Sequence, residues 1–379
     1  MQPGQLDRVC YFYENLLIMK YLLLVFSFIG GALKAQYVGP GQPEIKKLKT
    51  LIAKDAEVKK FYASFQEKAD QSLGEEPHPI DTIRSEGLLE GNPKKAATRL
   101  ALTDMPKVYA LALVYRVSGE AKYLEKVTAY LKAWATQNTP NGDPIDDTNL
   151  DNPIEAYDMV KDKLSTADAN VVQTWLKRTA EAEINGRHNR PKSGTATNNW
   201  NSHRLKIIGE IAFATGDTAL QNYTINGLKK QVEINLNPDG PSTDFVSRDA
   251  LHYHVYDLEP LLKLAIVLQR ATGVNYYTWQ SPSTASIQKS VDWLLPYLNG
   301  QKTHPEFVNS TVPFDRARAN NGEAAYKSGT LFDPKNGIHT LLLAAWFDAG
   351  VLPLARQLLN TQDRYPAWQS VVNEILKGH

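Results

Sequence analysis

A recurring pattern of helical segments that end at a glycine constrains the fold of this chain more than any other feature. Apolar residues with helical spacing occur at 104–116, 200–213, 250–269 and 338–347. These four segments are followed by Gly119, Gly216, Gly273 and Gly350. Three of the glycines lead at once into a second helical segment, at 122–135, 219–235 and 352–359. Glycine suits the left-handed conformation that ends a helix, so the pattern predicts antiparallel helical hairpins.

The hairpins predict an all-α architecture. Further helical spacing at 45–71, 154–164 and 168–184 gives about twelve helices, and no convincing alternating strand pattern is present. Hairpins need neighbours to bury their apolar faces, which leaves an open solenoid or a closed toroid. Long irregular insertions at 136–153, 186–199, 236–247 and 300–335 favour the toroid, whose loops build a cleft. We therefore predict one (α/α) toroid, or incomplete barrel, of about six hairpins over residues 36–379.

The first 35 residues are expected to lie outside this domain. Met19 and Lys20 precede a short apolar run at 21–29, and small residues follow up to Ala35. This order is typical of a secretory signal, and the run is too short for a stable membrane span. We therefore expect an exported protein, periplasmic or secreted.

Acidic residues further upstream fit a signal poorly, so we interpret Met19 as the true start. These residues are Asp7 and Glu14. The only cysteine, Cys10, lies in the same upstream piece, so no cysteine metal site and no disulfide are expected in the mature chain. The formal net charge of +1 gives no electrostatic case for a nucleic-acid partner. We expect a monomer without a cofactor.

The stretch 247–260 concentrates polar and aromatic side chains next to an apolar helix face. At about 100° per residue, Arg248, His252 and Tyr256 fall at roughly 0°, 40° and 80° of one strip. Clustered titratable groups mark functional sites only probabilistically. Core packing of these side chains is the competing interpretation. His254 falls on the apolar side, so we interpret it as structural.

A second polar stretch, 187–204, leads from a Gly/Ser/Thr loop into a helix that begins at Asn198 or Asn199. Asn199 and His203 are four residues apart and share a face. A capping asparagine and a solvated histidine are the competing interpretation.

Together the two stretches would supply an amide, two imidazoles, a guanidinium and a phenol, without an isolated pair of acids. Most glycosidases need two carboxyl groups that flank the bond. Elimination at a uronic acid instead needs donors that neutralise the sugar carboxylate, and groups that take and give a proton. The residue types match elimination better than hydrolysis.

The stretch Ala250-Leu-His-Tyr-His-Val-Tyr256-Asp-Leu-Glu-Pro-Leu261 resembles the R-A-L-x-Y-H-N-Y-A-L-x-P-L segment of the alginate lyase family. Asn198-Asn-Trp200 resembles that family's Asn-Asn-His. The resemblance extends over residues 45 to 350. It implies an (α/α) toroid and β-elimination on an anionic, uronate-containing polysaccharide, such as alginate or a glucuronan-like polymer.

The resemblance also implies residue roles. Tyr256 matches the tyrosine that transfers a proton to the glycosidic oxygen, and Asn199 matches the asparagine that neutralises the substrate carboxylate. Trp200 stands where the family has a histidine, so His203, one turn further on, is the expected replacement. The family's arginine falls on Asp249, and we expect the neighbouring Arg248 to take that role.

Further side chains are expected to bind the substrate: Trp200, His252, Tyr253, Asn198, Arg84 and Arg316. Trp200 is as suited to a wall of the site as to stacking on a sugar. Other basic residues that would suit a polyanion cleft are Lys94, Lys95, Arg99, Arg187, Arg190, Lys192 and Arg318.

Three rival functions remain open at this point. A helical-toroid hydrolase of unsaturated uronates would need an acid pair, such as Asp249 with Asp147 or Asp151. A non-catalytic protein would bind oligouronates without turnover. A metalloenzyme built on His252 and His254 is disfavoured, because residues two apart on a helix point in different directions.

Overall fold

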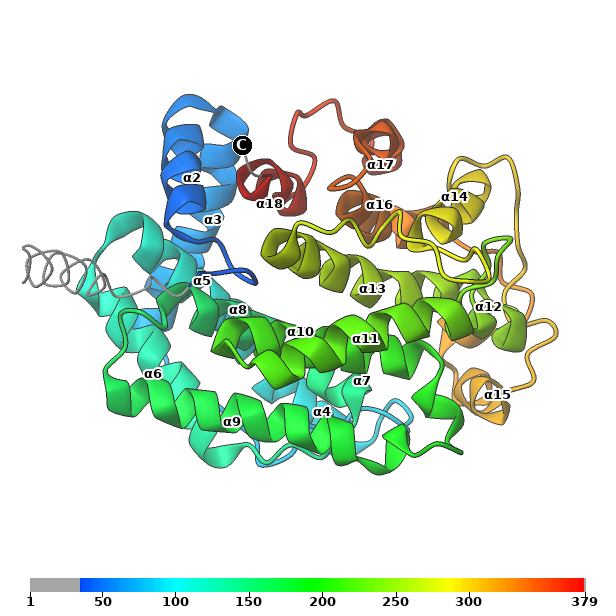
Figure 1. The fold of residues 1–379 in the computed structure, drawn as a ribbon, viewed down its shortest axis with the longest axis horizontal. Helices are drawn as coiled ribbons and strands as arrows, with labels where there is room; N and C mark the ends of the chain where they lie inside the picture. Colours follow the sequence, from blue (N-terminus) through cyan, green and yellow to red (C-terminus); the bar gives the residue numbers. More distant parts are fainter. Residues whose placement is uncertain (1–34, 378–379) are drawn as a thin grey trace, which may run out of the picture. The chain divides into compact units, whose positions relative to one another are not determined.

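Helices make up the regular structure of residues 35–377, which are the residues described by this computed structural model (Figure 1). No strand occurs among them, and two isolated bridges join Leu236 to Ser242 and Pro305 to Leu331. The all-α prediction is therefore confirmed. The predicted signal segment up to residue 34 lies outside the described residues, and residues from Gln36 onward form one unit.

The connections between successive helices range from one or a few residues to long irregular segments such as 74–92. The first half contains α2 (Gln42–Lys54), α3 (Ala56–Leu73), α4 (Pro93–Ala101), α5 (Asp104–Ser118), α6 (Ala121–Gln137), α7 (Pro144–Asp147), α8 (Asp151–Val160) and α9 (Thr166–Asn185). The second half contains α10 (Asn199–Thr215), α11 (Thr218–Asn235), α12 (Thr243–Arg248), α13 (Leu251–Thr272), α14 (Ile287–Leu298), α15 (Pro313–Asn320), α16 (Ile338–Ala344), α17 (Leu352–Leu359) and α18 (Trp368–Leu376).

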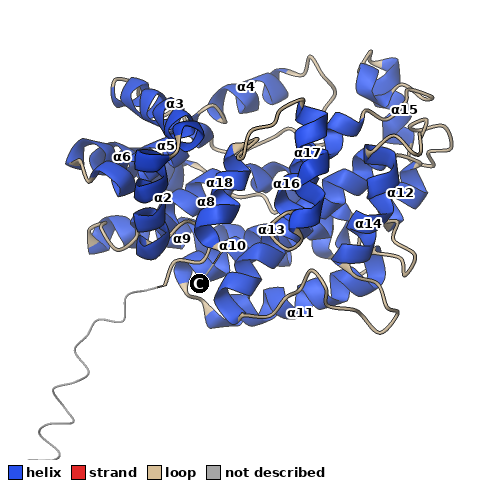
Figure 2. Cartoon of the chain, turned by 90° about the horizontal axis from the view of Figure 1, so that it is seen from above, coloured by secondary structure: helices blue, strands red, loops and turns tan. Residues whose placement is uncertain are grey.

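An inner circuit of helices closes the toroid. Successive contacts run from α5 through α8, α10, α13, α16, α18 and α2 back to α5. The partners α3, α6, α9 and α11 pack on the outside of this circuit, and α9 also contacts α6. Seen from above, α2, α18 and α16 lie in sequence (Figure 2). The toroid, rather than the open solenoid, is the observed closure.

Within this circuit, α10 and α13 lie side by side (Figure 1). Both are buried on nearly every side, as expected for helices without a continuous polar face. The charged residues that α10 buries have charged partners: Arg204 meets Glu183 at 3.5 Å and Lys206 meets Asp151 at 2.6 Å. Such pairing is required because an isolated buried charge is costly.

The predicted glycine caps are confirmed at three of four positions. Gly119, Gly216 and Gly273 end α5, α10 and α13 with φ values of 81°, 73° and 74°. Gly350 is different, because α16 already ends at Ala344 and Gly350 lies in a 3₁₀ turn. The prediction of a helix cap at that glycine was wrong.

The helical segment predicted over 45–71 is confirmed, and it consists of two helices, α2 and α3. The helix is interrupted at Asp55. The Asp55 carboxylate accepts hydrogen bonds from the backbone N–H groups of Glu57 at 2.9 Å and Val58 at 3.2 Å. An aspartate in this position is a strong N-cap, so it starts a new helix, α3. Within residues 35–377, no helix combines the length and apolarity that a membrane crossing needs.

Candidate active site

A cavity of about 180 Å³ lies at the N-terminal ends of α10 and α13. It is lined by Glu86, Ile145, Asn199, Trp200, Arg248, His252, Tyr253, Tyr256, Arg318 and Tyr326. Six of these were predicted site residues, and they come from both polar stretches. The two stretches therefore face one opening, as the sequence predicted.

The segment that carries Arg248, His252 and Tyr256 is not one continuous helix, because the backbone turns sharply between α12 and α13. Helix α12 ends at Arg248, Asp249 adopts a left-handed conformation with φ 49°, and α13 begins at Leu251. The predicted helical strip of Arg248, His252 and Tyr256 was therefore wrong. Arg248 still lines the cavity, whereas the Asp249 carboxylate turns to the loop beyond and accepts the backbone N–H of Asn309 at 2.8 Å.

Two guanidinium groups contact Tyr253, one at its ring and one at its hydroxyl. Arg248 lies over the ring at 3.8 Å and donates to the Asp315 carboxylate at 2.6 Å. Arg318 donates to the Tyr253 hydroxyl at 2.9 Å and lies 4.6 Å from the ring centre of Tyr326. Arg318 is thus a second cation of the cavity, which the sequence placed only among general basic candidates.

Two other predicted substrate-binding arginines do not line the cavity. Arg316 is exposed and donates to the carbonyl of Ser310 at 3.2 Å. Arg84 is also exposed, and its backbone is held by the hydroxyl of Thr98. Substrate binding by Arg84 and Arg316 therefore stays a prediction, and any contact they make with a polymer lies outside this cavity.

Tyr256 presents its phenol to the cavity from α13. Burial, and next the carboxylate of Glu86, raise the pKa of Tyr256 well above its ordinary value, while Arg318 opposes this shift. The hydroxyl is therefore protonated near neutral pH. Its ring packs on His203 with centroids 4.3 Å apart and lies parallel to His252 at 6.4 Å.

His203 lies behind Tyr256 and does not line the cavity. Its Nε2 bonds to the backbone oxygen of Tyr256 at 3.1 Å, and its Nδ1 to the hydroxyl of Thr148 at 2.8 Å. Lys206 donates to that same hydroxyl at 2.7 Å. Burial lowers the pKa of His203 to about 3, so the ring is neutral. These contacts fit a positioning residue, because both ring nitrogens are already engaged.

His252 lies in the cavity wall one turn before Tyr256. Burial, and then the charges of Arg318 and Arg248, lower the pKa of His252 to about 4, so its imidazole is neutral. None of the hydrogen bonds among residues 35–377 involves its ring nitrogens, although its backbone N–H donates to Glu306 at 3.0 Å. His252 is therefore a neutral imidazole available to a ligand. His254, in contrast, is fully buried and bonded to Ser242 and Ser290, as its structural interpretation predicted.

The start of α10 places an amide in the cavity. Asn198 is the N-cap and accepts the backbone N–H of Trp200 at 3.1 Å, so its side chain serves the helix and does not line the cavity. Asn199 donates its backbone N–H to Asp244 at 2.8 Å and its side-chain amide to the same carboxylate. Trp200 lines the wall and packs against the ring of His188 with centroids 4.7 Å apart.

A flanking acid pair is not among the described residues that line the cavity, where Glu86 is the only carboxylate. Asp249 faces Asn309, Asp147 is buried, and Asp151 is paired with Lys206 and Lys263. The acids that a hydrolase would need are therefore elsewhere. No group of three or more metal-ligating side chains is arranged around a common point in the described part of the chain.

The fold and the cavity together define a polysaccharide lyase built on an (α/α) toroid. The sequence model of the alginate lyase family matches residues 48–304, which is more than half of the chain. The chain belongs to the alginate lyase family.

Individual relatives agree with this placement. The chain is 24% identical over 252 residues to a polysaccharide lyase of Stenotrophomonas maltophilia, covering 61% of this chain and 74% of the relative. An alginate lyase from Bacteroides ovatus superimposes with a TM-score of 0.65 at 17% identity, covering 89% of this chain and 97% of that one. Alginate lyase A1-III from Sphingomonas species A1 superimposes with a TM-score of 0.52 at 17% identity, covering 82% and 96% of the two chains. At these identities the structural likeness shows the shared toroid.

Proposed function

We propose that this lyase cleaves a uronate-containing polysaccharide, alginate or a glucuronan-like polymer, by β-elimination. The cut would leave a 4,5-unsaturated uronate at one new end. One observation carries the proposal: a protonated phenol, an unengaged neutral imidazole, two guanidiniums and an amide share one cavity. A variant of alginate lyase A1-III complexed with a tetrasaccharide has the same fold, with a TM-score of 0.54, which supports an oligosaccharide ligand for this cleft.

The first step is neutralisation of the sugar carboxylate. The side-chain amide of Asn199 uses one of its two N–H groups on Asp244, which leaves the second for a ligand. Arg248 and Arg318 supply positive charge on the same wall. Donors placed where negative charge develops lower the barrier to its formation, so they make the hydrogen on C5 more acidic.

The second step is proton transfer by the two residues on α13. His252 accepts the hydrogen of C5 as a proton, and the electron pair forms the C4–C5 double bond. The bond from C4 to the glycosidic oxygen breaks, and Tyr256 donates its proton to that oxygen. The bound carboxylate raises the pKa of His252 towards neutrality, because a nearby anion stabilises the imidazolium. His252 thus takes the role first expected of His203.

The position of the two groups also predicts which uronic acid the enzyme prefers. His252 and Tyr256 are four residues apart on α13 and approach a ligand from one side. In mannuronate and glucuronate the C5 hydrogen and the C4 oxygen lie on the same side, whereas in guluronate they lie on opposite sides. We therefore expect preference for mannuronate or glucuronate polymers.

The direct test follows the ultraviolet absorbance of the new double bond on purified polymannuronate, polyguluronate and glucuronan. We expect absorbance to grow on the first or the last. Consumption of an unsaturated substrate would instead favour the hydrolase, and tight binding without new absorbance would favour a binding protein.

Export and assembly are separate proposals that rest on the sequence. We propose that the segment ending at Ala35 is removed on export and that residues 36–379 form one monomeric domain. N-terminal sequencing of the exported protein tests the cleavage, and light scattering tests the monomer.

A further inference from the structure

Two distant segments meet at one wall of the cavity. The loop 74–92, between α3 and α4, reaches the segment 313–326, which holds α15 and the 3₁₀ turn Ala324–Tyr326. Glu86 faces Arg318 at 3.6 Å, and both line the cavity. Beside them, the backbone N–H of Glu90 donates to the Glu323 carboxylate at 3.2 Å, and the Asn321 amide donates to the carbonyl of Glu90 at 3.2 Å. We refer to Glu86, Glu90, Arg318, Asn321 and Glu323 as the end wall.

The loop side of the end wall is anchored from below. The buried carboxylate of Asp146 accepts the backbone N–H of Ser85 at 2.7 Å, its hydroxyl at 2.7 Å and the backbone N–H of Glu86 at 3.0 Å. The Glu90 carboxylate also pairs with Lys95 at 2.7 Å and with Arg99 at 2.8 Å. Three hydrogen bonds to one buried carboxylate fix the backbone that carries Glu86.

The opposite side is anchored to the helices of the site. The buried carboxylate of Asp315, on α15, accepts from Arg248 at 2.6 Å and from the Ser310 hydroxyl at 2.6 Å. Arg318, one turn later, bonds the Tyr253 hydroxyl at 2.9 Å. Both halves of the end wall are therefore held by buried side chains, and not by the exposed contacts alone.

The end wall presents an obstacle to a continuous polyuronate. The cavity volume of about 180 Å³ lies below the 300–1,000 Å³ of common ligand sites. Glu86 is close enough to Tyr256 to raise the pKa of its phenol. A chain that continued past Tyr256 in this direction would meet the Glu86 carboxylate and the contacts of the Glu90 backbone with the side chains of Asn321 and Glu323. Carboxylates of like charge repel, which adds to the steric barrier.

We propose that the end wall restricts this lyase to chain ends, so that it releases short products and does not cut at random inside the polymer. The proposal rests on the elimination activity proposed above and specifies where along the chain that activity occurs. Glu86 is the specificity-determining carboxylate, and Asn321 and Glu323 hold the wall closed.

The first experiment compares two signals on one long uronate polymer during turnover by the full enzyme. Ultraviolet absorbance counts the bonds that are broken, and viscosity reports internal cuts. We expect absorbance to rise with little loss of viscosity, and short oligosaccharides from the earliest time points. At equal mass and subsaturating substrate, halving the chain length should double the initial rate, because the number of ends doubles. Early loss of viscosity with products of mixed length would overturn the proposal.

The second experiment opens the wall without touching residues that line the cavity. The double variant Asn321→Ala, Glu323→Ala should lose more viscosity per double bond formed than the wild type. Its matched control is Glu120→Ala, which removes an exposed carboxylate that, among residues 35–377, pairs with Lys122 at 2.9 Å. The wild type could act at chain ends while the double variant keeps the same loss of viscosity per double bond formed. That result would show that the end wall does not cause the restriction to chain ends. Absence of new absorbance on every uronate polymer would remove the proposed elimination itself, whereas internal cleavage removes only the restriction to chain ends.

Discussion

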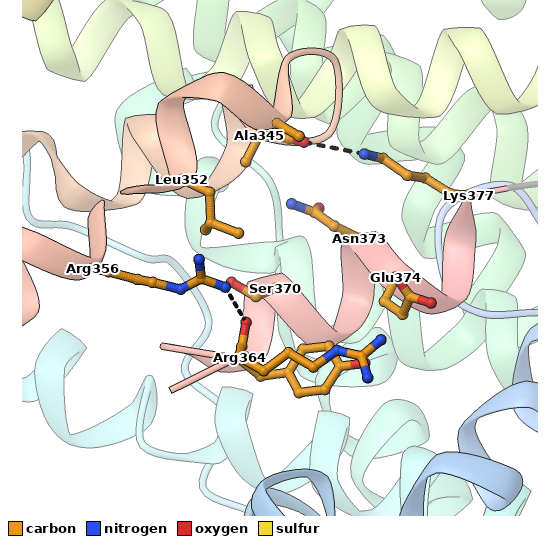
Figure 3. A pocket seen from close by; sticks show the side chains of 10 residues that line it. Ala345, Leu352, Arg356, Arg364, Ser370, Asn373, Glu374 and Lys377 are labelled. Carbon is orange, nitrogen blue, oxygen red and sulfur yellow. Dashed lines mark hydrogen bonds between the residues drawn. The ribbon is translucent and has the colours of Figure 1, made fainter. Parts of the chain in front are cut away.

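Two hollows of similar size differ in how their cations are used. The active-site cavity measures about 180 Å³, and a second hollow of about 210 Å³ lies between α16, α17 and α18 (Figure 3). In the second, Arg356 donates to the backbone carbonyls of Asp363 at 2.8 Å and Arg364 at 2.9 Å, and Lys377 donates to that of Ala345 at 3.3 Å. Its basic side chains therefore satisfy the protein's own carbonyl groups.

The active-site cavity is built at the N-terminal ends of two helices. Asn199 and Trp200 open α10, and His252 lies in the first turn of α13. The N-terminal end of a helix carries a partial positive charge, which favours an anion. The comparison teaches that a count of arginines does not identify an anion site. The difference is that the guanidiniums of the active-site cavity contact side chains of its wall beside two helix N-termini, whereas the basic groups of the second hollow bind backbone carbonyls.

The largest effect on turnover is expected from removing the Tyr256 hydroxyl, compared with removing a tyrosine hydroxyl from the second hollow. Tyr256→Phe should lower kcat by about a hundredfold to ten-thousandfold, because the leaving oxygen loses its proton donor. The matched control is Tyr365→Phe in the second hollow, whose buried hydroxyl has no hydrogen-bond partner among the described residues. Initial rates of double-bond formation and thermal unfolding of both variants test this. Turnover of Tyr256→Phe at the wild-type rate would contradict the role of the phenol.

His252→Gln is expected to lower kcat by about a hundredfold, because glutamine cannot accept the proton. The pH profile supplies a second reading. The pKa of His252 in the free enzyme is lowered to about 4, and a base acts only when unprotonated. Activity that depends on His252 is therefore present above about pH 4 and lost below it. The profile of kcat/KM should lose this acid limb in the variant. If the loss of activity at acid pH is unchanged in the variant, a group other than His252 causes it.

The sequence was sufficient to predict the toroid and the residues whose position depends on local geometry. Helical spacing and terminal glycines such as Gly216 marked the hairpins, and the paired motifs brought Tyr256 and Asn199 to one opening. The choice between His203 and His252 could not be made in the same way. Spacing shows which residues share a helix face, but α10 is buried all round, so its face at His203 meets α13 instead of the cavity.

Residues from the irregular segments were missed for a related reason. Arg316 and Arg318 are two apart on a short helix, and the anchoring of Asp315 decides which of them reaches the cavity. Glu86 reaches the cavity because a buried carboxylate, Asp146, binds its loop from a distant part of the chain. Neither placement leaves a periodic signal, since both depend on tertiary hydrogen bonds.

The next prediction compares the removal of one arginine from each hollow. Arg318→Ala should lower kcat/KM by about tenfold to a hundredfold, as expected for loss of a hydrogen bond from a charged group worth about 1.5–3 kcal/mol. Arg356→Ala, the control, removes a guanidinium that bonds backbone carbonyls and should leave kcat/KM unchanged while lowering the unfolding temperature. Equal losses of activity in the two variants would contradict the assignment of catalytic function to the first cavity and not to the second hollow.

The smallest effect on turnover is expected at His203, which supports Tyr256 from behind. His203→Gln should lower kcat only a few-fold, because it removes the packing against the phenol ring without removing a reacting group. Its effect on pH-dependent stability should be clearer. The pKa of His203 is lowered to about 3 by burial, whereas an unfolded histidine titrates near 6.5.

At this histidine, the unfolded chain therefore binds up to one more proton than the native protein at mildly acidic pH. The stability that neutral His203 contributes is complete above about pH 6.5 and is lost as the pH falls towards 3. The free energy of unfolding should fall less steeply with acid in His203→Gln than in the wild type. Parallel slopes for His203→Gln and the wild type would mean that this imidazole is not held neutral behind Tyr256.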